Sequence, residues 1–441
     1  MKFKIQATPE SINSSAGLVP AGRLIDHLEF DKTLDNTTVN ETTLHDVPNS
    51  SCVRSYLGLL LEGRTAFDEI EARRSDKLFS DALDVPLVPS AATMRQRFDQ
   101  AAGAFDEVLK GGNVRLLRSC DFGSVSTRRG ELVPVDADVA CQDNSNSHKE
   151  GVAPTYHHFD GFAPMFAYVG TEGFMLANEL RPGDQHCQNG TPQFLQECVD
   201  RLEYIGACST LFRLDGGNDA GENLRVLQGR ADYIIKRNLR RESPSNWRET
   251  AREHGTEYNP REDKTVWHGS LWSTFPDRKG LNTPVRLVFE VTERRTDRAG
   301  TPLLYPDIEV QSWWTSLQHD SDNRVIELYR DRGTSEQFHS EFKTEVGLER
   351  LPSGKFATNS TVMQLGMLAY NILRRIGQDI LQLPGKLPLR KEIARRRVRK
   401  VIQDVIRVAC KYVRTSRQAI LKLRSDWSYF EVFRQLHAVY S

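Results

Sequence analysis

The chain has no apolar run long enough to cross a lipid bilayer, and its first residues, MKFKIQATPESINSS, contain no apolar core of the kind a secretory signal peptide carries. Its seven cysteines are widely scattered and include no Cys-x-x-Cys pair, which argues against a disulfide framework and against a zinc ribbon. These absences predict a cytosolic protein with free thiols and no membrane association.

The chain also has no overall excess of acidic or basic residues, because its formal net charge is zero. The charges are nevertheless strongly segregated along the sequence. Between Lys386 and Arg424 the basic residues far outnumber the two acids, Glu392 and Asp404. Apolar residues recur in this segment at near-helical intervals. We therefore expect basic amphipathic helices whose cationic face binds phosphates and whose affinity falls as salt rises.

With 441 residues, of which 39% are apolar and 27% charged, the chain is predicted to be globular and to form more than one domain. Its first part reads as mostly helical. There the loop VPLVPS followed by AATMRQRF resembles the turn and second helix of a helix-turn-helix, with Ser90 as the N-cap and Arg95 and Arg97 facing outward. A helix that carries two arginines is equally compatible with an ordinary solvent-exposed helix.

From residue 131 the pattern changes to strands, ELVPVDADVA, GFAPMFAYVG and GFMLANELR, followed by alternating helices and strands. This order describes a mixed sheet with helices on its faces. Residues 239–324 then have polar loops and three strand-like segments and hold five of the six tryptophans, which predicts a β-rich insertion. Tryptophans in such a module are usually core residues, although clustered rings also stack on bases forced out of a duplex.

The fold class predicted from these patterns is α/β, with an RNase H-like mixed-sheet catalytic domain, a β-rich insertion, and helical N- and C-terminal regions. The predicted domains are a mostly helical DNA-binding region over 1–128, a catalytic domain over 129–238 and 325–384, the insertion over 239–324, and a basic helical region over 385–441.

Candidate catalytic acids lie where strands end. Asp215 closes the apolar strand STLFRLDGG just before two glycines, and Asp136 and Asp138 close LVPVDADV, where the period of two places both on one face. Carboxylates fixed on rigid elements are what a catalytic divalent metal needs. Turn and strand-end aspartates are also common for purely structural reasons.

A third acid lies in YRDRGTSEQFHSEFK, which spaces Tyr329, Arg332, Glu336 and Lys343 at steps of three, four and seven. If the stretch were one helix, the four side chains would share a face. Thr334 and Gln337 instead predict a capping box that starts the helix after Arg332. Glu336 would then lie in the first turn, where the helix dipole favours the ionised carboxylate.

These motifs together resemble a bacterial insertion-sequence transposase of the DDE type, whose third acid lies in a Y-x2-R-x3-E-x6-K signature that Tyr329, Arg332, Glu336 and Lys343 match position by position. Within that superfamily the chain is most similar to the insertion-sequence-1380 group, through VPVDADVA, GFAPMFAYVG, LFRLDGG with DYIIKRN, and the N-terminal FDEIEARRSDKLF and VPSAATMRQRF. The resemblance runs from about residue 50 to the C-terminus.

The resemblance implies that Asp138, Asp215 and Glu336 bind two Mg²⁺ ions, or Mn²⁺ in their place. The family's Asp-x-Thr/Ser pattern points to Asp138, but Ala140 departs from it and leaves Asp136 as an alternative first acid.

For the remaining residues, the resemblance implies that Arg332, Lys343 and Tyr329 contact DNA. The basic segment adds Arg395, Arg396 and Arg397 as predicted phosphate contacts.

The implied activity is that of a polynucleotidyl transferase: metal-dependent cleavage at terminal inverted repeats and strand transfer to target DNA, by a homodimer in a bacterial, nucleoid-associated setting. Two alternatives stay open. One is a transposase-derived DNA-binding protein that no longer catalyses, and the other is an RNase H-like nuclease without strand transfer.

Overall fold

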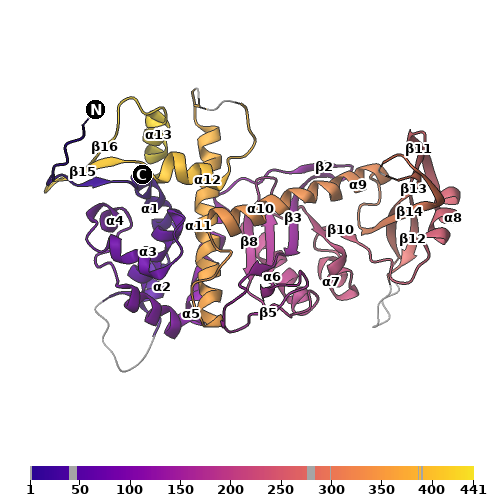
Figure 1. Ribbon diagram of the computed structural model, residues 1–441, viewed down its shortest axis with the longest axis horizontal. Helices are drawn as coiled ribbons and strands as arrows, with labels where there is room; N and C mark the ends of the chain where they lie inside the picture. The colour runs from indigo at the N-terminus through magenta and orange to yellow at the C-terminus, as the bar shows by residue number, and fades with distance from the viewer. Residues whose placement is uncertain (1, 39–46, 276–283, 298, 386, 389–390) are drawn as a thin grey trace.

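The computed structural model describes residues 2–38, 47–275, 284–297, 299–385, 387–388 and 391–441. The molecule is elongated (Figure 1), with N-terminal helices and the C-terminal segments at one end, a large sheet in the middle and long β-strands at the other end.

The N-terminal region is helical, as the sequence predicts. Its elements are α1 (Leu18–Asp26), α2 (Asp31–Asp35), α3 (Asn49–Leu61), the 3-10 helix η1 (Phe67–Arg73), α4 (Lys77–Ala82) and α5 (Ala91–Arg118). Ser90 is the N-cap of α5, because its Oγ accepts a hydrogen bond from the Thr93 backbone N–H at 3.1 Å. Apolar residues of α3 and α5 form one continuous core with the long helix α11 (Phe356–Gln382).

The predicted outward position of Arg97 is wrong. Its side chain is 3% exposed and donates to the Val47 carbonyl oxygen at 3.1 Å and to the Asn49 amide oxygen. Arg95 is exposed, as predicted, and lies over the Phe67 ring at 5.7 Å. The physical reason is that Arg97 lies on the buried face of the long helix α5, together with Met94, Phe98 and Ala101.

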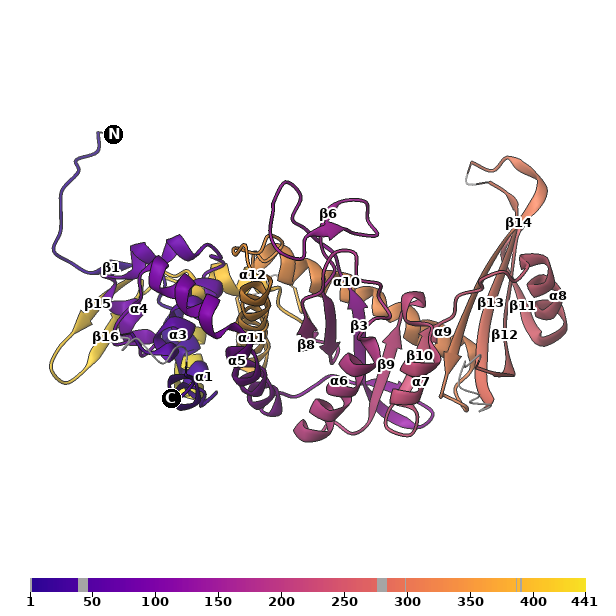
Figure 2. The same ribbon diagram turned by 90° about the horizontal axis from the view of Figure 1, so that it is seen from below.

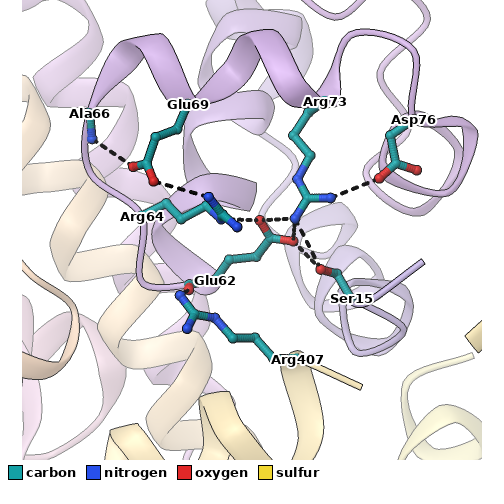
Figure 3. Close-up of polar contacts among 8 residues, drawn as sticks. All are labelled: Ser15, Glu62, Arg64, Ala66, Glu69, Arg73, Asp76 and Arg407. Carbon is teal, nitrogen blue, oxygen red and sulfur yellow. Dashed lines mark hydrogen bonds and ion pairs between the residues drawn. The ribbon is translucent and has the colours of Figure 1, made fainter. Parts of the chain in front are cut away.

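A polar cluster ties the N-terminal helices to the C-terminal segment (Figure 3). The buried Glu62 carboxylate accepts two hydrogen bonds from Arg73 Nη2, at 2.7 and 2.8 Å, and a third from the Ser15 hydroxyl. Arg407 donates to the Glu62 backbone carbonyl. Because Glu62 is buried and paired, the cluster is a structural joint between distant parts of the chain.

The central sheet runs in the order β8–β7–β3–β9–β10. Its strands are β3 (Gly130–Val139), β7 (Met165–Val169), β8 (Phe174–Glu179), β9 (Thr210–Leu214) and β10 (Asp232–Lys236). β3 is antiparallel to β7 and parallel to β9, and β9 is parallel to β10. The strands predicted over these segments are thus confirmed.

The two faces of this sheet are covered by different helices. Val135 and Ala137 of β3 pack with residues of α6 (Thr191–Ile205) and α7 (Gly221–Leu227). The other face packs against α9 (Asp322–Arg330). The alternation along β3 therefore turns Asp136 and Asp138 toward the α9 side.

The predicted β-rich insertion extends the same sheet. After helix α8 (Pro244–His254), its strands are β11 (Gly255–Arg261), β12 (Lys264–Thr274), β13 (Pro284–Thr296) and β14 (Pro302–Thr315). β14 pairs antiparallel with β10, with Trp314 opposite Ile235. Of the five tryptophans here only Trp272 is exposed, at 59%, so the others are core residues.

Smaller elements surround these layers. They are β2 (Val125–Thr127), which pairs with β3, the three-stranded sheet of β4 (Gln142–Asp143), β6 (Asp160–Phe162) and β5 (Ala153–Pro154), and the 3-10 turn η2 (Gly216–Asn218).

The C-terminal region is only partly helical, which corrects the helical region predicted for 385–441. It contains α12 (Val398–Val401), the π-helical turn η5 (Ile402–Ile406), β15 (Cys410–Arg414), β16 (Ala419–Lys422) and α13 (Phe430–Tyr440). β15 and β16 form a hairpin where the sequence indicates a helix. The reason is that β15 also pairs with β1 (Ile12–Asn13), from the opposite end of the chain. All seven cysteines are free thiols, and no helix of the described residues has the length and apolarity that crossing a membrane requires.

Candidate active site

The two candidate acids of β3 have different surroundings. Asp136 is 4% exposed and accepts hydrogen bonds from Arg213 Nε and Nη2, both at 2.7 Å. Asp138, two residues further along on the same face, lines a cavity of about 830 Å³. Asp138 is therefore the acid of this pair that faces open space.

Arg213 was not predicted from the sequence, yet it joins the elements around the site. It lies on β9 directly opposite Asp136 in the parallel register, and its Nη1 also donates to the Leu328 carbonyl of α9 at 2.8 Å. One guanidinium thus fixes β3, β9 and α9 relative to one another. The sequence feature that could have indicated this pair is that Arg213 and Asp136 each precede a candidate acid by two residues.

Asp215 follows β9 directly and lines the same cavity as Asp138. Its Oδ1 accepts a hydrogen bond from Asn218 Nδ2 at 2.6 Å, from within the turn η2. Because β3 and β9 are parallel neighbours, their ends bring Asp138 and Asp215 to one edge of the sheet.

Glu336 lies on α10 (Ser335–Ser340), is exposed, and lines this cavity as well. The predicted capping box at Thr334 and Gln337 is wrong. Thr334 has helical dihedral angles, φ −65° and ψ −24°, and makes no side-chain cap. A helical backbone runs without a break from α9 through the 3-10 turn η3 (Asp331–Thr334), so the helix-start dipole predicted for Glu336 is absent.

The cations of the signature lie beside the acids. Arg332 and Lys343 both line the cavity, and Arg332 forms an ion pair with Asp138. Lys343, in the π-helical turn η4 (Glu341–Glu345), donates to the Cys141 carbonyl at 2.5 Å and lies 3.2 Å from a Glu349 carboxylate oxygen. Acids and cations from separate segments of the chain thus line one cavity.

Tyr329 is not among the described residues that line this cavity. Its ring packs against Trp313, with 5.6 Å between ring centroids, and burial raises its pKa to about 12. The structure thus gives Tyr329 a packing contact with the insertion, and its predicted DNA contact stays a prediction.

The charged groups that line the cavity shift one another's pKa values. Burial raises the pKa of Asp138 to about 6, with Arg332 opposing the rise and Asp215 adding to it. The pKa of the Arg332 guanidinium is raised by the charges of Asp138 and Asp215, which outweigh its burial. Two carboxylates that repel each other at the edge of a sheet are stabilised when a cation lies between them.

Buried polar atoms without partners also face this site. Arg332 Nε and His339 Nε2 have no hydrogen-bond partner within the described part of the chain. Burial, together with the nearby cations Arg332 and Lys343, lowers the pKa of His339 to about 3, so this imidazole is neutral at physiological pH. A neutral ring nitrogen and a guanidinium N–H are both able to hydrogen bond to an oxygen-rich ligand such as a phosphate.

The donor set fits a hard divalent metal, because the carboxylate oxygens of Asp138, Asp215 and Glu336 are the ligands that Mg²⁺ and Mn²⁺ prefer. Among the described residues, no group of three or more His, Cys, Asp or Glu side chains is arranged closely enough to hold a metal as it stands. The Arg332 guanidinium, which lies against Asp138, instead supplies the positive charge there.

The three arginines predicted to contact DNA lie outside this cavity and are engaged in ion pairs. Arg395 pairs with the buried Glu341 at 2.8 Å, and Arg396 is itself buried and pairs with Asp404 at 2.8 Å. Arg397 is half exposed and pairs with Glu345. In this conformation only Arg397 presents its guanidinium to solvent.

Sequence reasoning also missed a group of aromatic residues on the cavity rim. Tyr156, His157 and Phe159 line it from the turn between β5 and β6. The sequence feature that could have indicated this group is the stretch TYHHF, in which aromatic residues lie within a polar loop.

Comparison with known proteins gives one family. The model described as "Transposase DDE domain group 1" matches residues 1–440. No match was found among curated proteins. Among solved structures, the chain is similar to a piggyBac transposase synaptic complex with hairpin DNA determined by cryo-EM, with 9% identity, a TM-score of 0.42, and coverage of 82% of this chain and 74% of that one.

Proposed function

The chain belongs to the transposase DDE domain group 1 family, and we propose that it is a DNA transposase that cuts at terminal inverted repeats and joins the freed ends to target DNA. The observation that carries the proposal is that Asp138, Asp215 and Glu336, from three separate elements, line one cavity together with Arg332 and Lys343. Strand-end acids on adjacent parallel strands and a helical acid across from them also support an RNase H-like catalytic core.

In this proposal Asp138, Asp215 and Glu336 would hold two Mg²⁺ ions. Bound there, the ions would activate the attacking oxygen and stabilise the leaving oxygen of an in-line displacement. Asp138 is favoured over Asp136 as the first acid because Asp136 is already neutralised by Arg213.

The protein's own groups would hold the DNA. Arg332 and Lys343 would bind oxygens of the scissile phosphate, Arg332 through the Nε–H that has no partner among the described residues and Lys343 as a point charge. The neutral His339 would donate or accept one hydrogen bond at the cavity wall.

The proposed chemistry needs no covalent protein intermediate. In cleavage, a water oxygen bonds to phosphorus while the bond from phosphorus to the 3′ oxygen breaks, and that oxygen leaves as a 3′-hydroxyl. In strand transfer, the same hydroxyl attacks a target phosphodiester, and the target's own 3′ oxygen leaves. Joining two element ends in one event requires two such centres, which supports a homodimer.

A Glu336→Gln variant tests the proposal. Loss of one carboxylate ligand should remove several kcal/mol of transition-state stabilisation, so we expect Mg²⁺-dependent cleavage of duplexes carrying the terminal repeats to fall by about 10³-fold. Binding of the same duplexes, measured by fluorescence anisotropy, should remain.

Glu327→Gln is the matched control, because Glu327 is an exposed acid of α9 outside the cavity. Its cleavage rate should equal that of the wild type. Undiminished cleavage by Glu336→Gln would refute the assignment, and a wild-type protein that binds ends without cutting them would identify a non-catalytic relative.

A further inference from the structure

A rigid hairpin tip carries aromatic rings to the edge of the acid cavity. In the segment Thr155–Phe159, the rings of Tyr156 and His157 have centroids 4.2 Å apart, and those of His157 and Phe159 are 6.0 Å apart and nearly parallel. All three residues line the cavity that contains Asp138, Asp215 and Glu336. Figure 2 shows the segment around β6 projecting beyond the sheet next to α10.

The backbone of this tip is held in one shape. The Thr155 backbone N–H and hydroxyl both donate to the Phe159 carbonyl, at 2.9 and 2.8 Å, and the His158 N–H donates to the Thr155 carbonyl at 3.0 Å. His158 has φ +63°, the left-handed conformation that closes a three-residue hairpin loop. The rings are therefore presented by a preorganised turn.

The Tyr156 ring is anchored beside the first acid. The Tyr156 hydroxyl donates to the Val139 carbonyl at 3.2 Å, and Val139 directly follows Asp138. This hydrogen bond fixes the Tyr156 side chain at the cavity, beside the acid.

These rings do not belong to the hydrophobic core. Tyr156 is 59% exposed, and His157 is exposed as well. The tryptophans predicted as stacking candidates are placed elsewhere: four are buried, and the exposed Trp272 lines a different hollow, beside Arg129 and Thr210. At the acid cavity, the described residues that offer exposed ring surface thus come from the hairpin tip.

We propose that Tyr156 and His157, backed by Phe159, form a stacking platform for an unpaired nucleobase of the DNA end whose phosphate lies at the acids. Every base has a π-face, so stacking holds a base without reading its sequence. Lys343 and Arg332 on the same cavity supply the charge that a nucleotide phosphate requires. This role rests on the proposed function, and it specifies that the hairpin holds an unpaired base of the DNA substrate.

The test uses a probe whose fluorescence reports stacking. The probe is an oligonucleotide duplex with a short single-stranded end, in which the first unpaired base is 2-aminopurine. It is bound to the Glu336→Gln protein in Mg²⁺, so that no cleavage occurs. We expect 2-aminopurine fluorescence to be quenched on binding, and the quench to be lost in added Tyr156→Ala and His157→Ala variants.

The same variants should bind the single-stranded-ended duplex about tenfold more weakly, because one base–ring stack contributes roughly that factor. Binding to a blunt, fully paired duplex should be unchanged, which also shows that the variants are folded. Tyr156→Phe should keep the quench, because it keeps the ring. Tyr204→Ala is the matched control, since Tyr204 is an exposed tyrosine of α6, on the opposite face of the sheet.

An equal quench in wild-type and both alanine variants, or binding without any quench, would overturn the platform. Either result would leave the transposase proposal standing. Absence of DNA binding by the wild-type protein, or undiminished cleavage by Glu336→Gln, would instead refute the proposed function itself.

Discussion

At the scale of single residues, the site shows how neighbours give one residue type two roles. Asp136 and Asp138 lie two residues apart on one strand and face the same side. The first is sealed by a bidentate guanidinium, whereas the second opens to the cavity. The sequence alone could place both on this face. It left open which of them is the first acid, because Arg213, the residue that pairs with Asp136, lies on another strand.

Removal of Arg213 should destabilise the protein. An Arg213→Met substitution leaves the Asp136 carboxylate buried without a partner, and losing one member of a buried ion pair costs about 3–5 kcal/mol. The free energy of unfolding, measured by urea denaturation, should fall by that amount.

The double variant Asp136→Leu with Arg213→Met removes both charges and is the control for this prediction. It should recover most of the lost stability, because no buried charge remains unpaired. A loss below about 1 kcal/mol in the single variant, the range of an exposed pair, would show that the pair does not hold the strands together.

At the scale of elements, the helix that carries Glu336 is also a docking surface for the C-terminal segment. The buried Glu341 of η4 binds Arg374 of α11 at 2.7 Å and Arg395 at 2.8 Å, and it accepts the Val398 backbone N–H at 3.0 Å. In this conformation Arg395 pairs with Glu341 and Arg396 with Asp404, and their DNA contact stays a prediction. Its composition identified this segment as basic, but composition does not show which basic side chains form ion pairs with buried acids.

The exposed cations of α12 are the better test of a phosphate contact. Arg399 and Lys400 are exposed and lie next to the docked arginines. If both contact phosphates, an Arg399→Gln, Lys400→Gln variant should reduce the slope of log affinity against log salt concentration by about two. Anisotropy titrations of duplex DNA over a range of salt concentrations measure this slope.

A charge-preserving swap, Arg399→Lys with Lys400→Arg, controls for changes other than charge and should leave the slope unaltered. If the glutamine variant kept the wild-type slope, these two side chains would lie outside the DNA interface.

The errors in predicted elements have two physical causes: pairing between segments far apart in sequence, and a helix that begins earlier in the chain than predicted. The near-helical spacing around Tyr412 indicated a helix, but β15 forms there because β1 and β16 supply strand partners on both sides. The capping box at Thr334 failed because the helix already begins at α9. Strands and helices of the central sheet were predictable because their apolar periods match their burial.

At the scale of the whole molecule, the sheet joins the acid-lined cavity to the predicted insertion. β14 pairs with β10, so the β11–β14 strands continue the sheet that carries Asp138 and Asp215. The insertion was predicted from a change in sequence pattern, to polar loops and strand-like segments, and its boundaries remain a proposal. Its attachment through strand pairing could not be predicted, because neither edge strand encodes its partner locally.

Cysteine rescue measures whether Asp138, Asp215 and Glu336 ligate the metal that, in our proposal, DNA cleavage requires. Each acid is replaced singly by cysteine, and cleavage of terminal-repeat duplexes is measured in Mg²⁺ and in Mn²⁺. Because thiolates bind softer metals better than Mg²⁺, we expect cleavage to be lost in Mg²⁺ and partly restored in Mn²⁺ for all three variants. Equal loss in both metals, or restoration by Asp136→Cys in place of Asp138→Cys, would contradict it.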